Sequence, residues 1–345
     1  MTNVERANRA RGALTGLAIG DALGMPTQYL SRPVIHARYG VLSGFEPAPD
    51  DNDISRGMPA GHVTDDTDQA VILGTLLVEG NGSVDPEEFA RQLLAWEKRM
   101  RATGSRDLLG PSTLKALSLA AEGVDTDRTG RWGDTNGASM RIAPVGIAAS
   151  THRLDALVDM VEQVSFVTHN TGIAIAGASA IAAAVSAGVD GLSMTETLDL
   201  AVRAADIGSS RGYYIAGADV ASRINWALDL VRDQDPDEAL ETIYQLVGVG
   251  VATQEAVPAA LAIASLFPAD PWTACRYAAS LGGDCDTIAA MTGAVVGASN
   301  GIDVFPSEVR DQLAAANPEL RLGELADSLL RIRLANEAGD AANNS

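Results

Sequence analysis

The chain has 345 residues, 46% of them hydrophobic and 20% charged, and a formal net charge of −20 at pH 7. This balance is typical of a soluble globular protein and excludes disordered and fibrous classes. The negative charge argues against nucleic acid and against an anionic membrane as partners, because both are bound through surfaces rich in Lys and Arg.

The first segment of the chain resembles a signal peptide only superficially. Two arginines precede the apolar residues 13–19, but this stretch is short, is interrupted by glycine and runs directly into Asp21. The two cysteines, Cys275 and Cys285, cannot form a disulfide framework, and free thiols are typical of intracellular proteins. We therefore predict a cytoplasmic protein.

Small residues recur at every fourth position near both ends of the chain. Aromatic residues make up only 4% of the sequence, which favours tightly packed helices over strands. Small side chains at this spacing let two helix backbones approach closely, so we assign them to packing. They are Gly12, Gly16, Gly20, Gly24, Ala290, Ala294 and Ala298.

Residues 46–61 are rich in Pro, Asp and Gly and contain no regular apolar pattern. Because an acidic motif follows at once, we interpret this loop as a mobile rim over a functional site rather than a domain boundary. Its own acids, Asp50, Asp51 and Asp53, are assigned to a solvated turn.

Residues 64–68 read TDDTD and form the first acid cluster, directly before the apolar residues 70–77. Residues 282–287 read GGDCDT and form the second acid cluster, before the apolar residues 288–298. Each acid cluster is therefore expected at the start of a helix.

The middle of the chain carries many helix start signals. Asp-Pro pairs at 85–86, 235–236 and 270–271 place a capping acid before a proline in the first turn, and Ser193 with Glu196 forms a capping box. No convincing alternation of apolar and polar residues indicates strands. We predict an all-α protein of about a dozen helices.

Residues 172–189 are uncharged and long enough to suggest a membrane span. Alanine and glycine make the stretch only weakly hydrophobic, and Ser179 and Ser186 interrupt it. A helix buried in the centre of a soluble bundle explains it better.

The acid clusters have two physical explanations. Asp and Thr cap helix N-termini, but one cap needs one acid, and each cluster has more. Crowded oxygen donors instead favour a hard cation such as Mg²⁺, Mn²⁺ or Ca²⁺, although neither segment has the spacing of an EF-hand. If both clusters share ions, the two ends of the chain meet in one core, so we predict a single domain over residues 1–335 and a polar, frayed tail over 336–345.

Five motifs in order resemble the ADP-ribosylglycohydrolase family, which includes the dinitrogenase-reductase-activating glycohydrolases. They are GDALG at 20–24, TDDT at 64–67, NGASMRIAP at 136–144, TH at 168–169 and GGDCDT at 282–287. The resemblance spans roughly residues 10–301. It implies a compact all-α fold with two divalent ions, Mg²⁺ or Mn²⁺, between the acid clusters.

The resemblance also implies roles for individual residues. The expected metal ligands are Thr64, Asp65, Asp66, Asp284, Asp286 and Thr287. The expected substrate contacts are Asn136, Gly137, Ala138, Ser139, Met140 and His169. The family cleaves a glycosidic bond at the anomeric carbon of a ribose, so the expected substrate is an ADP-ribosylated protein or a small ribosyl or ADP-ribosyl conjugate.

The chemistry agrees with this implication. Two cations can hold vicinal ribose hydroxyls and lower the pKa of a water, whose proton a nearby carboxylate accepts during attack on an oxocarbenium-like centre. Asp65, Asp66 and Asp286 are the candidate bases, and the sequence does not rank them. Arg141 is assigned to a structural pairing.

Gln28 departs from the family pattern, because relatives usually carry an acid there. Glutamine cannot act as a general acid or base, but it can hold a water or a ribose hydroxyl. Two alternatives therefore stay open. One is an N-ribosyl hydrolase of nucleoside type acting on a small molecule, and the other is a non-catalytic relative that binds ADP-ribose.

Overall fold

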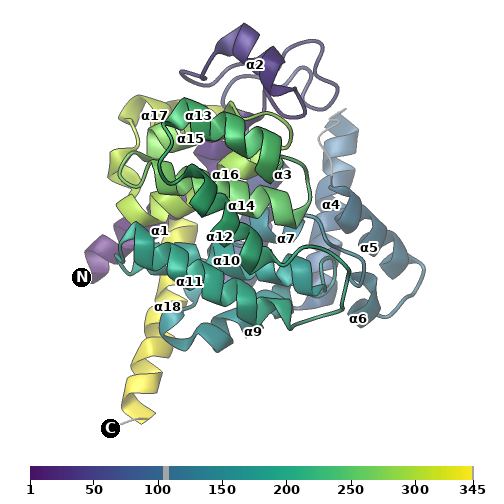
Figure 1. The fold of residues 1–345 in the computed structure, drawn as a ribbon. Coiled ribbons are helices and arrows are strands. Elements are labelled where there is room, and N and C mark those ends of the chain that lie inside the picture. The colour runs from purple at the N-terminus through teal and green to yellow at the C-terminus, as the bar shows by residue number, and fades with distance from the viewer. Residues whose placement is uncertain (104–108, 344–345) are drawn as a thin grey trace.

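The computed structural model describes residues 1–103 and 109–343. In this part of the chain, eighteen α-helices and three short turns of 3-10 or π-helix form the regular structure, and no strand is present (Figure 1). The described residues contain two isolated β-bridges, which pair Thr135 with Ala252 and Thr171 with Tyr213. The all-α prediction is confirmed. Short helices raise the number above a dozen, because four to six residues leave no readable periodicity.

The bounds of the elements are as follows. The first half contains α1 (Asn3–Gly24), α2 (Arg32–Tyr39), α3 (Asp65–Glu79), α4 (Pro86–Thr103), α5 (Pro111–Ala121), α6 (Thr126–Thr129), α7 (Gly137–Met140), α8 (Ala143–Ala148), η1 (Thr151–Arg153) and α9 (Leu154–Ser165). The second half contains α10 (Gly172–Val189), α11 (Met194–Ser209), α12 (Val220–Val231), α13 (Pro236–Thr242), η2 (Ile243–Val247), α14 (Thr253–Leu266), α15 (Pro271–Ala279), α16 (Cys285–Asn300), η3 (Ile302–Val304), α17 (Ser307–Ala316) and α18 (Leu322–Asn343).

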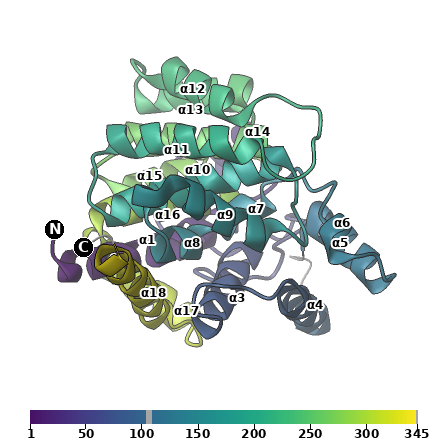
Figure 2. The same cartoon turned by 90° about the horizontal axis from the view of Figure 1, so that it is seen from below.

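The helices stack in layers around α10 and α16, as Figure 2 shows. Helices α4, α5 and α6 lie along one side of this stack, and α2 with its following loop forms one edge in Figure 1. Helix α10 is the one helix among the described residues that is long and apolar enough to cross a membrane, and it is completely buried inside the protein. The prediction of a buried central helix is therefore confirmed.

Helices α1 and α16 form the most extensive helix pair in the described residues. A Cβ atom added to Gly16 would lie 2.1 Å from the carbonyl oxygen of Gly293, and one added to Gly20 would lie 2.0 Å from that of Ala289. At Gly24 it would lie 2.2 Å from the Cα of Asp286. The glycine repeat therefore brings the end of α1 into backbone contact with the second acid cluster.

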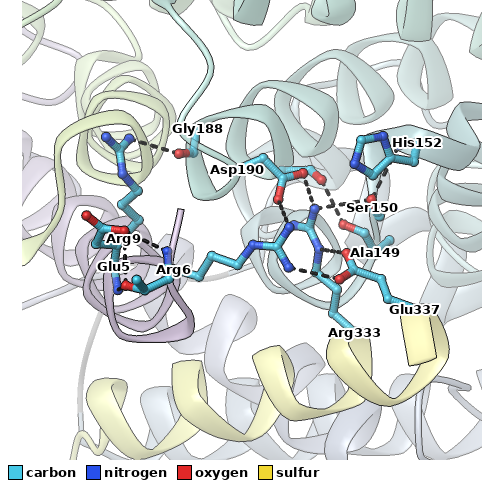
Figure 3. Close-up of polar contacts among 12 residues, drawn as sticks. Glu5, Arg6, Arg9, Ala149, Ser150, His152, Gly188, Asp190, Arg333 and Glu337 are labelled. Carbon is cyan, nitrogen blue, oxygen red and sulfur yellow. Dashed lines mark hydrogen bonds and ion pairs between the residues drawn. The ribbon is translucent and has the colours of Figure 1, made fainter. Parts of the chain in front are cut away.

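Ion pairs fasten the N-terminal and C-terminal helices to the end of α10 (Figure 3). Arg333 of α18, whose side chain is 1% exposed, pairs with Asp190 and with Glu337. Arg6 of α1 pairs with the same two acids, at 2.9 Å from Asp190 and 2.8 Å from Glu337. Each carboxylate thus bridges two guanidinium groups, which compensates their burial.

Helix α18 extends into the segment that was predicted to be a polar, frayed tail. Helix α18 continues to Asn343, and Glu337 takes part in the ion pairs described above. The charge of Glu337 thus has partners in two helices. Residues 344 and 345 lie outside the described residues.

We expect Arg333→Met to lower the free energy of unfolding by about 3 kcal/mol, because it leaves buried carboxylate charge without part of its compensation. Urea denaturation followed by circular dichroism measures this change. Arg11→Met is the matched control, since Arg11 also joins α1 to α18, through Asp327, but is 45% exposed. Its loss should cost less than about 1 kcal/mol. Equal effects of the two substitutions would contradict this account.

Candidate functional site

The structure brings the two acid clusters together, although they lie near opposite ends of the sequence. The first opens α3 and the second opens α16. The hydroxyl of Thr287 donates a hydrogen bond to Oδ2 of Asp66 at 3.4 Å, and the hydroxyl of Thr64 approaches the same oxygen at 3.3 Å. Asp66 therefore lies at the point where both clusters meet.

Capping does not account for these residues. Thr64 and Asp284 occupy the N-cap positions of α3 and α16, but neither side chain accepts a capping hydrogen bond from a backbone N–H of its own helix. At other helices the N-cap side chain does accept a hydrogen bond from the backbone of the first turn, as at Thr171, Ser193, Asp219, Asp235 and Asp270. Thr171, three residues after Thr168, is the cap of α10. Helix capping therefore does not explain why the two clusters are so rich in acids.

Asp21 holds the first acid cluster in place. This fully buried carboxylate accepts hydrogen bonds from the backbone N–H and hydroxyl of Thr64, at 3.0 and 2.8 Å. It also accepts from the backbone and hydroxyl of Thr67, at 3.1 and 2.5 Å. Burial raises the pKa of Asp21 to about 6, although these bonds favour its ionised form. The GDALG motif contains this residue, but nothing in the sequence around it separately indicated its role.

Crowded carboxylates dominate the electrostatics of the site. Burial raises the pKa of Asp66 well above its usual value, and repulsion from neighbouring carboxylates adds to the shift. Those neighbours are Asp65, Asp21, Asp286 and Asp284. Burial also raises the pKa of Asp284 to about 6, against hydrogen bonds from Asn136 and Thr287. A positive charge among these groups would stabilise all of their ionised forms.

Asn136 connects the predicted substrate loop to the second acid cluster. Its side-chain amide donates to Oδ2 of Asp284 at 2.5 Å, and its backbone N–H donates to the carbonyl of Val251 at 2.9 Å. The short helix α7 starts at the next residue, Gly137. Asn136 therefore places α7 beside the carboxylates.

A cavity of about 220 Å³ lies above the acid clusters. Most of the residues expected to bind substrate or metal line it: Gln28, Asp65, Asn136, Gly137, Met140, Asp284, Asp286 and Thr287. The others are at most 2% exposed and support the wall from behind: Thr64, Asp66, Ala138, Ser139 and His169. The loop that was predicted as a rim reaches the cavity through Ile54.

A chain of hydrogen bonds runs behind the cavity wall and starts at Asp65. Gln69 donates to Asp65 at 2.6 Å and accepts from the buried Arg141 at 2.7 Å. Arg141 in turn donates to the hydroxyl of Thr168 at 2.5 Å. Arg141 therefore has the structural role that was predicted, but its hydrogen-bond partners are the amide of Gln69 and the hydroxyl of Thr168 rather than a carboxylate.

His169 continues this chain toward the cavity. Its ring nitrogens lie 2.9 Å from the hydroxyl of Thr168 and 3.1 Å from that of Thr135, which lines the cavity. Burial, and then the charge of Arg141, hold the pKa of His169 well below its usual value, so the ring is neutral. A Cβ atom at Gly137 would lie 2.9 Å from the ring. His169 therefore supports Gly137 and Thr135 from behind.

Gln28 lies in the cavity wall with 2% of its surface exposed. Its backbone carbonyl accepts a hydrogen bond from Asn52 at 2.9 Å, which ties the rim loop to this wall. Its Nε2 atom is buried without a hydrogen-bond partner among the described residues. The amide can turn toward a polar group in the cavity.

The chemistry of the donors fits a hard divalent cation. Oδ1 of Asp66 is buried and has no hydrogen-bond partner among the described residues, which is costly for an ionised carboxylate unless a cation is near. No group of three or more His, Cys, Asp or Glu side chains in the described residues is arranged to hold an ion unaided. Ligation would therefore also draw on the hydroxyls of Thr64 and Thr287.

Comparisons with known proteins agree on one family. A family model described as ADP-ribosylglycohydrolase matches residues 2–339. The uncharacterized protein YegU of Escherichia coli K12 is 35% identical over 334 residues, which cover 96% of this chain and 99% of YegU. ADP-ribosylarginine hydrolase Tri1 of Pseudomonas putida is 29% identical over 327 residues, covering 91% of this chain and 76% of Tri1.

A solved structure shares the fold. It is called an ADP-ribosylglycohydrolase-related protein complex and matches with a TM-score of 0.67 at 24% identity, covering 96% of this chain and 99% of the other. At this identity the likeness shows the fold alone.

Proposed function

Because the chain belongs to the ADP-ribosylglycohydrolase family, we propose that it is a metal-dependent hydrolase that removes ADP-ribose from a protein side chain or a small conjugate. The observation that carries the proposal is the meeting of two distant acid clusters at Asp66 and Thr287, beneath a cavity. Tri1, a relative, is named for the hydrolysis of ADP-ribosylarginine.

The cavity is the place proposed for the ribose at which cleavage occurs. Its volume of about 220 Å³ is below the roughly 300 to 1,000 Å³ of pockets that enclose a whole drug-sized ligand. A ribose and part of a phosphate match it better than a complete ADP-ribose does. The rest of the nucleotide would extend past Asn136, Gly137 and Met140, on the side of the cavity formed by α7 and the residue before it.

The proposed ligands of two divalent ions, Mg²⁺ or Mn²⁺, are the oxygen donors of both acid clusters: Thr64, Asp65, Asp66, Asp284, Asp286 and Thr287. The buried Oδ1 of Asp66 and the mutual repulsion of the carboxylates support this set. Such ions supply Lewis-acid polarisation of ribose hydroxyls and of a water. The hydroxyl oxygens of Thr64 and Thr287 would add uncharged ligands to the carboxylates.

Asp65 and Asp286 are the better placed of the three candidate bases. Both line the cavity, so either carboxylate can accept a proton from a water that attacks the anomeric carbon. Asp66 is fully buried beneath them, which suits a ligand rather than a base. The hydrogen bond from Gln69 orients Asp65 for this step.

Gln28 has a binding role in this proposal. A neutral amide in the cavity wall can hold a ribose hydroxyl or a water without exchanging a proton. Because Gln28 supplies no acid, the alternatives of a nucleoside-type N-ribosyl hydrolase and of a non-catalytic ADP-ribose-binding protein remain part of the test.

Product analysis separates these functions. ADP-ribosyl-arginine, ADP-ribosyl-serine and a panel of nucleosides are incubated with the protein, with Mg²⁺ or Mn²⁺ and with excess EDTA. We expect release of ADP-ribose only in the presence of metal, and restored activity when Mg²⁺ or Mn²⁺ is added back. The same ions should raise the melting temperature, because a ligand that binds only the folded state stabilises it.

Other outcomes would contradict the proposal. Release of free ribose from nucleosides, without release of ADP-ribose from conjugates, would favour the N-ribosyl hydrolase. Tight binding of ADP-ribose without turnover of any substrate would favour the binding protein. Turnover that persists in EDTA would contradict the metal dependence.

A further inference from the structure

Tyr29 has an unusual backbone conformation beside the site. Its φ angle is +58°, and Asn81 is the one other non-glycine residue with a positive φ in the described part of the chain. A bulky aromatic residue rarely adopts this region, which costs energy unless the surroundings impose it. Such strain often marks a side chain that must point in a particular direction.

Backbone hydrogen bonds impose the conformation. The N–H of Tyr29 donates to the carbonyl of Gly283 at 2.6 Å, and the N–H of Gly283 donates to the carbonyl of Leu30 at 3.0 Å. Gly283 itself has a φ of +67° and directly precedes Asp284. Tyr29 and its neighbour Leu30 are thus each joined by one backbone bond to Gly283 in the second acid cluster.

The Tyr29 side chain lines the cavity and is 57% exposed, so it stands at the cavity mouth. Partial burial raises the pKa of its phenol, and the negative charges of the acid clusters add to this, with Asp284 and Asp286 foremost. The phenol therefore remains protonated, and the aromatic ring lies within the field of both clusters.

Tyr29 and Asn136 contact different residues of the second acid cluster. Asn136 binds the carboxylate of Asp284, whereas Tyr29 is held by the backbone at Gly283. In the proposed function the phosphates extend along the wall of Asn136, Gly137 and Met140. Tyr29 lines the same cavity from the segment between α1 and α2 and not from α7, so the group across the scissile bond is the one that remains for it.

Resting on the proposed function, we propose that the Tyr29 ring is the contact surface for the leaving group and selects planar leaving groups. A guanidinium is planar and, when charged, is attracted to an aromatic face and to surrounding carboxylates. The serine side of an O-linked conjugate is aliphatic and uncharged, so it offers neither feature. Tyr29 thus favours ADP-ribosyl-arginine over ADP-ribosyl-serine.

The test compares wild type, Tyr29→Ala and Tyr29→Phe on both conjugates, with kcat and KM determined separately. We expect Tyr29→Ala to raise KM for ADP-ribosyl-arginine about tenfold, the scale of a lost stacking contact. The kcat/KM of Tyr29→Ala for ADP-ribosyl-serine should change by less than about threefold. Tyr29→Phe keeps the ring and should retain the arginine preference.

Two controls isolate the leaving-group contact. ADP-ribose lacks a leaving group, so its inhibition constant should stay within about twofold in Tyr29→Ala. Tyr214→Ala removes a tyrosine that is 89% exposed and does not belong to the cavity wall described above, and it should change nothing. Thermal unfolding of each variant shows whether the fold is kept.

The outcomes distinguish the two proposals. Two results would overturn the role of Tyr29 while the wild type remains active. One is an equal loss of activity on both conjugates in Tyr29→Ala. The other is a weakening of ADP-ribose inhibition as large as the rise in KM for ADP-ribosyl-arginine. Absence of wild-type turnover on both conjugates would contradict the proposed function, and would remove the premise of the Tyr29 assignment with it.

Discussion

Asp66→Asn is expected to abolish turnover while the protein stays folded. Asp66 is the residue at which the two acid clusters meet, and asparagine keeps its shape but removes its charge. The loss in kcat should reach roughly three orders of magnitude or more, as when one member of a catalytic unit is removed. Product analysis measures the loss, and circular dichroism confirms the fold.

Asp51→Asn is the matched control for Asp66→Asn. It removes the same charge from the rim loop, where Asp51 is 61% exposed and pairs with Arg38. Because this acid lies in a surface ion pair, its loss should leave kcat within about twofold. Wild-type activity in Asp66→Asn, or an equal loss in both variants, would contradict the role assigned to Asp66.

Asp66→Asn is expected to abolish turnover, but in the absence of metal it should not destabilise the fold. The pKa of Asp66 is raised on folding, so the wild-type protein loses stability as pH rises from about 4 toward neutrality, where the buried carboxyl must ionise. Asparagine carries no such cost. In EDTA at pH 7, Asp66→Asn should therefore melt at or above the wild-type temperature, and the difference should shrink at pH 4. A lower melting temperature at pH 7 would contradict this expectation.

Gly20→Ala is expected to lower the free energy of unfolding by about 3 kcal/mol or more. The added methyl group would lie 2.0 Å from the carbonyl oxygen of Ala289, and backbone cannot move aside as a flexible side chain can. Helices α1 and α16 would have to separate, which would also displace Asp21 and Asp286. Urea denaturation measures the stability, and product analysis should show reduced turnover in the folded fraction.

Gly323→Ala separates this packing effect from helix propensity. Gly323 lies in the first turn of α18, and a Cβ atom there meets no atom within 4 Å. Alanine should leave stability unchanged or raise it by up to about 1 kcal/mol, because it favours helix. The glycine-mediated contact between α1 and α16 would be contradicted if Gly20→Ala behaved in the same way.

The sequence predicted best those features of the fold that are visible within a single segment of the chain. The glycine repeat predicted close helix packing, because spacing along one helix is visible in one segment. The excess of acids over what a cap needs separated these clusters from ordinary helix starts, and the N-caps of α3 and α16 do lack the capping bonds found at other helices. The length and composition of α10 were sufficient to predict a buried helix.

Features that depend on distant partners could not be predicted in this way. A single acid within a helix does not reveal that it will bind Thr64 and Thr67, as Asp21 does. The motif at 168–169 indicated a substrate contact, but whether His169 enters the cavity or supports its wall depends on how closely α7 approaches. Helix α18 continues into the polar C-terminal segment, and the partner of Glu337 there, Arg6 of the first helix, cannot be read from the segment itself.

Anomalous diffraction from crystals grown with Mn²⁺ tests the central claim most directly. We predict two anomalous peaks between the first acid cluster and the second, with Asp66 and Asp286 both contributing oxygens. Crystals of Asp66→Asn should lose at least one peak. Fully occupied Mn²⁺ elsewhere on the protein, with no density between Asp66 and Asp286 in the wild type, would contradict the account.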